Sequence, residues 1–145
     1  MAFADIFGAK PARGKITIDG STVTGGGSTP TTITLPDHRS GDTWQGLVET
    51  EIRDPQGNAI KLGGAVITLQ VKRRRTDRMP ALELSSATGD IQIVDSMAGV
   101  ISIGSRRINL MPGAYVFDIQ ITLSNGDVIT PVQGTWLITP DVTRN

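Results

Sequence analysis

The chain of 145 residues contains no cysteine and one histidine, His38. Without cysteine there is no disulfide and no thiolate ligand for zinc. No run of about 20 apolar residues occurs, so no segment is predicted to cross a bilayer as a helix. Fourteen basic and fourteen acidic residues cancel to a formal net charge of +0, which leaves no overall attraction to nucleic acid or to an anionic membrane. We therefore expect neither as a partner.

The N-terminus lacks the pattern of a secretory signal. Asp5 interrupts its short apolar stretch, and no basic region precedes that stretch. We therefore expect the protein to be made and to fold in the cytoplasm.

The clearest pattern lies in Leu110–Pro140. Apolar and polar residues alternate over Tyr115–Leu123, which predicts a half-buried β-strand. Asn125-Gly126 follows, a pair that favours a type I′ turn because both central residues of that turn take positive φ. A second strand returns over Val128–Ile138, so the stretch predicts a β-hairpin.

Similar alternation recurs between turn residues elsewhere, and predicts strands over 43–53, 66–73, 81–84, 91–93 and 100–103. With the hairpin, this makes an all-β protein, a sandwich of about seven or eight strands. The predicted core residues are Trp44, Val48, Ile67, Leu69, Val71, Ile91, Tyr115, Phe117, Ile119, Ile121 and Trp136.

Residues 1–40 differ from the rest and predict an extended N-terminal arm, with the sandwich domain over 41–145. Two weak strand patterns, 15–23 and 31–35, flank the flexible composition of Gly25–Pro30. The arm is either a frayed terminus or a segment that adds strands to a neighbour. In the second case we expect Phe3, Ile6 and Phe7 to make the contact.

The sharpest charge feature is Lys72–Arg78, with five cations in seven residues at a strand end and in the following loop. Three interpretations stay open: a phosphate-binding patch, a solvated loop, or a contact with an acidic neighbour. No aromatic residues interleave for base stacking. The predicted interface residues of this loop are Arg73, Arg74, Arg75 and Arg78.

No pattern in the sequence predicts a catalytic, cofactor-binding or metal-binding residue. His38 has Ser40 nearby, but no G-x-S-x-G turn accompanies it. Glu49 and Glu51 share one strand face, which we expect to be a solvent face. Calcium ligands remain an alternative for the aspartates in predicted turns, although such aspartates usually hydrogen-bond their own backbone; these are Asp54, Asp90, Asp95 and Asp127.

The turn residues follow one another in a specific order. The motifs are Arg39-Ser-Gly-Asp-Thr43, Asp54-Pro-Gln-Gly-Asn58, Leu62-Gly-Gly-Ala65, Leu110-Met-Pro-Gly-Ala-Tyr115 and Gly134-Thr-Trp-Leu-Ile-Thr-Pro-Asp-Val-Thr143. From residue 41 to 144 the chain resembles the small Ig-like β-sandwich module of tailed bacteriophages, similar to the N-terminal domain of upper baseplate proteins and to small tail or neck proteins. Met111 and the arginine-rich stretch 72–78 depart from that family's pattern.

The resemblance implies an Ig-like sandwich without catalytic residues that serves as a structural protein of the virion. Its expected place is tail, baseplate or fibre-attachment assembly, and its expected partners are other virion proteins or copies of itself as a homo-oligomer. Two alternatives stay open. One is an adhesin module that binds carbohydrate or a receptor, and the other is a neck, head-completion or capsid-decoration protein.

Overall fold

The computed structural model describes residues 14–17, 23–24, 27–28, 31–53 and 58–142, and these residues form strands, turns and loops without a helix. Hence no helix in the described part could span a membrane. The strands are β1 (Gly14–Thr17), β2 (Val23–Thr24), β3 (Gly27–Ser28), β4 (Thr31–Arg39), β5 (Thr43–Trp44), β6 (Leu47–Arg53), β7 (Val66–Lys72), β8 (Leu82–Ser85), β9 (Ile91–Asp95), β10 (Val100–Ile103), β11 (Arg106–Arg107), β12 (Gly113–Thr122) and β13 (Val128–Thr139).

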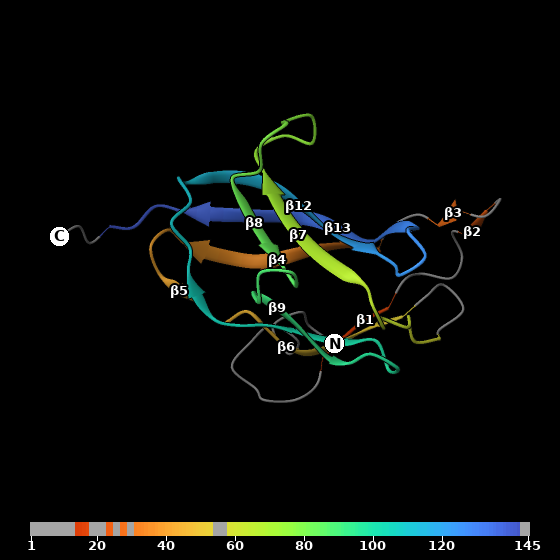
Figure 1. Cartoon of the computed structure of the whole chain (residues 1–145). Coiled ribbons are helices and arrows are strands. Elements are labelled where there is room, and N and C mark those ends of the chain that lie inside the picture. The colour runs from red at the N-terminus through yellow and green to blue at the C-terminus, as the bar shows by residue number, and fades with distance from the viewer. Residues whose placement is uncertain (1–13, 18–22, 25–26, 29–30, 54–57, 143–145) are drawn as a thin grey trace.

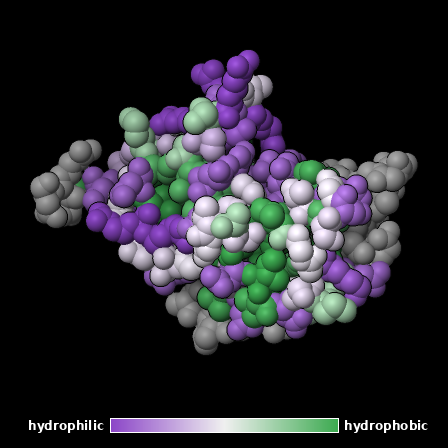
Figure 2. Space-filling model, viewed as in Figure 1, coloured by the Kyte–Doolittle hydropathy of each residue, from purple (hydrophilic) through white to green (hydrophobic). Residues whose placement is uncertain are grey.

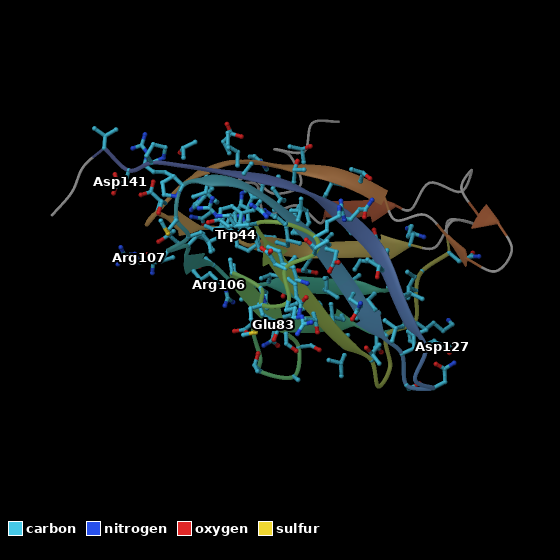
Figure 3. The ribbon with its side chains drawn as sticks, turned by 90° about the horizontal axis from the view of Figure 1, so that it is seen from above. Trp44, Glu83, Arg106, Arg107, Asp127 and Asp141 are labelled. Atoms are coloured by element: carbon cyan, nitrogen blue, oxygen red, sulfur yellow. The ribbon has the colours of Figure 1, made fainter. Side chains whose placement is uncertain are left out.

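Two sheets face each other across one core (Figure 1). The larger sheet has the order β4-β13-β12-β7-β8, and the smaller has the order β1-β6-β10-β9. Two further sheets have two short strands each, β5 with β11 and β2 with β3. The turn that carries Asp127 and the segment that carries Asp141 lie at opposite ends of the sandwich (Figure 3).

The strand order is that of an immunoglobulin-like sandwich. Strands β6, β10 and β9 take the places of B, E and D, whereas β13, β12 and β7 take those of G, F and C, with β8 added beside C. Near the start of β12, the hydroxyl of Tyr115 donates a hydrogen bond to the carbonyl of Met111 at 2.6 Å. This bond is the tyrosine corner found in such domains, and the predicted fold class is confirmed.

Alternation of side chains builds the core. On β7, Ile67, Leu69 and Val71 point inward, and on β12 the inward series runs from Tyr115 to Ile121. Every predicted core residue is buried except Val48, which is half-buried.

The prediction of one continuous strand over 43–53 was wrong, and so was the predicted solvent face. The strand is broken at Gly46, which has φ +77. The backbone of Gly46 lies so close to Ile103 that an added Cβ would be 2.0 Å from the carbonyl oxygen of Ile103. Glu49 then takes φ 25, so side-chain alternation is interrupted twice. Consequently Leu47 turns inward in place of Val48.

Glu51 is the residue most affected by this interruption. It is 8% exposed, and its carboxylate pairs with Arg53 at 2.8 Å. Glu49 remains exposed. The two glutamates therefore do not share a solvent face.

The predicted hairpin is confirmed, but its turn type is not. Gly126 N donates to Leu123 O at 2.9 Å, and Leu123 N donates to Asp127 O at 2.7 Å. Gly126 has φ +94, whereas Asn125 is not among the described residues with positive φ. The loop is thus a type I turn followed by a left-handed glycine, the usual three-residue hairpin connection.

The sandwich starts earlier than the predicted boundary at residue 40. Strand β4 pairs in parallel with β13, from Thr31 opposite Val132 onward, and buries Ile33 and Leu35. Pro36 does not end it, because β4 is an edge strand and can lack one backbone donor. The extended arm can therefore comprise residues 1–30 at most.

Candidate interaction site

The loop between β7 and β8 projects from the sandwich and carries the predicted arginines. It rises above the larger sheet (Figure 1) and forms a mostly hydrophilic projection on the surface (Figure 2). A tight turn shapes it, because Asp77 N donates to Arg74 O at 3.0 Å and Asp77 Oδ2 accepts from Arg74 N at 3.2 Å. The side chain of Asp77 therefore stabilises the loop that presents the cations.

Two of the four predicted arginines fold back onto the domain. The guanidinium of Arg73 lies 5.2 Å from the ring centroid of Tyr115, and its Nη2 donates to Pro112 O at 3.3 Å. Arg75 Nη1 donates to Gln133 Oε1 at 3.0 Å, across β12 to β13. These contacts anchor the loop at both sides of its turn.

The other two arginines are available to a partner. Within the described part of the chain, the side chains of Arg74 and Arg78 make no hydrogen bond or ion pair, and both residues are exposed. Met79 beside them is 80% exposed. The loop thus offers two unpaired guanidinium groups and one flexible apolar side chain, a combination suited to protein contact.

A shallow hollow lies beneath the loop on the outer face of the larger sheet. It is lined by Gln70, Lys72, Arg75, Val116, Phe117 and Asp118. Burial raises the pKa of the Asp118 carboxyl, although the charges of Lys72 and Arg75 act in the opposite direction.

This hollow holds about 60 Å³, whereas pockets for small ligands measure roughly 300–1,000 Å³. It can take a single side-chain head group from a partner but not a sugar ring. Asp118 and Gln133 could not be predicted from the sequence as neighbours of the loop, because only the pairing of β12 with β7 and β13 brings them there.

The predicted arm contacts Phe3, Ile6 and Phe7 lie outside the residues that the structure describes. The described part of the arm includes β1, which pairs in parallel with β6 of the same chain. In this structure the strand therefore joins its own sheet, whereas the two predicted alternatives for the arm were a frayed terminus and strands added to a neighbour.

His38 and Ser40 do not form a nucleophile and base pair. His38 Nε2 lies 3.0 Å from Asp42 O, and Ser40 Oγ donates to Leu110 O at 2.6 Å. The His38 ring lies 5.9 Å from that of Trp136. Both polar groups thus hold the segment that follows β4.

Of the four turn aspartates, Asp54 lies outside the described residues, and the other three hydrogen-bond within their own turns. Asp95 accepts hydrogen bonds from the backbone of Met97 and Ala98. The Thr88 hydroxyl and then the Arg106 guanidinium hold the pKa of Asp90 below its ordinary value. Across 14–17, 23–24, 27–28, 31–53 and 58–142, no group of three or more acidic or histidine residues could hold a metal ion.

No family model matches the chain, and no curated protein matches it. Among solved structures it is similar to CopC from Methylosinus trichosporium OB3b, with 11% identity, a TM-score of 0.36, and coverage of 61% of this chain and 74% of that chain. A similarity at that level supports no argument about function.

Proposed function

We propose that this chain is a structural protein of a tailed-bacteriophage particle. It acts in tail, baseplate or fibre-attachment assembly, as a rigid sandwich whose N-terminal arm and arginine loop contact neighbouring subunits. Its partners are other virion proteins, copies of itself, or both. Its location is the virion, and no catalytic step is part of the proposal.

One observation carries the proposal: three of the motifs behind the resemblance hold turns of the Ig-like sandwich. Gly41 N donates to Ile108 O at 2.7 Å, just before β5. Ala65 N donates to Leu62 O at 3.0 Å, just before β7. Tyr115 makes the tyrosine corner. The motifs therefore act together as one structural pattern, which is harder to match by chance than separate turns.

The packing supports a structural role over ligand binding. Trp44, Tyr115, Phe117 and Trp136 are all buried, so none of them forms an exposed platform for a sugar ring. A void between the two sheets, lined by Trp44, Phe117 and aliphatic side chains, holds about 10 Å³, too small for more than one water molecule. A dense core suits a rigid subunit that transmits load through its surface contacts.

Particle composition tests the proposal directly. Virions are purified from a lysate of the phage whose genome encodes this chain, and their peptides are quantified by mass spectrometry. We expect this chain at a constant ratio to other tail proteins across successive purification steps. Its presence in the lysate together with its loss from purified particles would refute the proposal.

The contact surface is tested on the purified full-length chain by light scattering after size exclusion. Arg74→Glu/Arg78→Glu reverses the two unpaired cations, and Lys61→Glu, at another exposed position, is the matched control. We expect the double variant, and not the control, to lose self-association or binding to a particle protein. An unchanged double variant would remove the loop from the interface. A glycan array with the same proteins tests the adhesin alternative.

A further inference from the structure

The first described strand, β1, lies at one edge of the smaller sheet. It runs parallel to β6, with Gly14 opposite Thr50 and Thr17 opposite Arg53. On its other side β6 pairs with β10, and β9 forms the far edge of this sheet. Strand β1 is therefore the element that completes the backbone pairing of β6.

The β6 edge needs a strand beside it. Thr50 and Ile52 are fully buried, and Glu51 is nearly so. Backbone N–H and C=O groups in such a position are costly when unpaired, and an open edge invites pairing with another chain. Any strand that pairs in this register satisfies the backbone groups of β6. A strand from a second molecule does so equally well.

The connection to β4 allows the strand to come from another molecule. The chain between Thr17 and Thr31 contains only one short pair, β2 with β3, among its described residues. Even with that pair kept, residues 18–22 and 29–30 reach roughly 23 Å when extended, at about 3.3 Å per residue. A compact chain of 145 residues has a radius of gyration of about 15 Å. A linker of this reach extends to the β6 edge of a copy that packs against the same side of the domain.

We propose that β1 is exchanged between copies, so that Gly14–Thr17 of one molecule pairs with β6 of the next. This inference rests on the proposed assembly function and names its acceptor edge and its partner, a second copy of this chain. Exchange keeps the same backbone pairs, so it costs little beyond association.

Cysteine cross-linking distinguishes exchange from pairing within one chain, because the native chain has no cysteine. Lys15 and Glu51 are register partners on β1 and β6, a spacing that suits a disulfide. Two full-length chains with different affinity tags, one with Lys15→Cys and the other with Glu51→Cys, are co-expressed and then mildly oxidised. Neither chain can form this bond internally.

We expect a disulfide-linked heterodimer whose digest contains a peptide pair joined through positions 15 and 51. The matched control combines Lys15→Cys with Gln92→Cys, an exposed position on the opposite edge strand β9, and should give no linked product. The pair Thr17→Cys and Arg53→Cys, also in register, repeats the test in case Glu51→Cys impairs folding.

A bond that forms only within the Lys15→Cys/Glu51→Cys double variant, with none between co-expressed single variants, would overturn the exchange. Linkage to position 92 in place of 51 would overturn the choice of β6 as the acceptor. Light scattering of the unmodified chain separates this result from the proposed function. If the unmodified chain is oligomeric while the co-expressed cysteine variants form no disulfide between positions 15 and 51, exchange alone is contradicted. Absence of the chain from purified virions contradicts the proposed function.

Discussion

The indole ring of Trp136 lies against that of Trp44, with ring centroids 5.2 Å apart. Trp136 belongs to β13 of the larger sheet, and Trp44 belongs to β5, which leads into β6 of the smaller sheet. The Nε1 of Trp136 also donates to Pro36 O at 3.1 Å, which ties β4 to the same position. The pair therefore joins three segments that are far apart in the sequence.

Truncation of Trp136 tests how much this packing contributes to stability. Trp136 is 1% exposed, so Trp136→Ala leaves a cavity and should lower the free energy of unfolding by about 3–5 kcal/mol. Leu137→Ala, at the adjacent and 43% exposed position, should change it by no more than about 0.5 kcal/mol. Denaturant melts compare the two, and a loss below about 1 kcal/mol for Trp136→Ala would contradict its place in the core.

The tyrosine corner is tested by removing a single hydroxyl. Tyr115→Phe leaves the ring in the core but deprives the Met111 carbonyl of its donor, which should cost about 1–2 kcal/mol of unfolding free energy. Met111→Ala keeps that carbonyl, and its side chain is 72% exposed, so it should have little effect. Equal stability of Tyr115→Phe and the unmodified chain in thermal and denaturant melts would show that the bond contributes nothing.

Substitution of Gly134 tests whether β4 pairs closely with β13. An added Cβ at this residue would lie 1.8 Å from the carbonyl oxygen of Ile33, so Gly134→Ala should push β4 away from β13 and cost more than about 2 kcal/mol. At Gly63 nothing lies within 4 Å of an added Cβ, so Gly63→Ala serves as the control. Faster amide exchange in β4 of Gly134→Ala is the expected readout, and unchanged exchange would refute the parallel pairing.

Asp118 should make stability depend on pH. Burial raises the pKa of its carboxyl above the ordinary 3.8, so the folded chain binds this proton more tightly than the unfolded chain does. Stability from this group is therefore greatest below the ordinary pKa and falls as the pH rises through the folded pKa. Asp118→Asn should unfold at higher denaturant than the unmodified chain near pH 7, and at the same concentration near pH 3. A lower midpoint near pH 7 would show instead that attraction to Lys72 and Arg75 dominates.

Substitutions of the loop arginines should differ in their effect on stability according to the contacts that each arginine makes. Arg73 stacks on Tyr115 and bonds to Pro112 O, so Arg73→Ala should lower stability by about 0.5–1 kcal/mol. Arg78→Ala removes no hydrogen bond or ion pair within the described residues and should leave stability unchanged while weakening assembly. Melting curves and light scattering on the same samples measure both effects, and the reverse pattern would contradict the assigned roles.

Local sequence patterns predicted the elements that depend on neighbours along the chain. Alternation over β7 and β12 and the glycine after Asn125 are readable residue by residue, because side chains of a strand point to its two faces in turn. The β12–β13 hairpin followed directly from these signals. The arginine loop was also evident as a run of like charges. The sequence did not reveal which of its arginines contact the domain.

Tertiary structure decided the features that depend on distant partners. Pairing of β4 with β13 joins residues about 100 positions apart, and it reassigned Ile33 and Leu35 from the predicted arm to the core. Burial of Glu51 arises from the close approach of Gly46 to Ile103 and the φ of Glu49, which no local pattern reveals. Arg75 differs from Arg78 only because Gln133 lies across the sheet. The sequence by itself determined regular strands such as β7 and β12 and the place of the hairpin, because these depend on local sterics. The strand break at Gly46, the sheet edges, the register and the unpaired arginines depend on contacts that form only when the two sheets pack on one core.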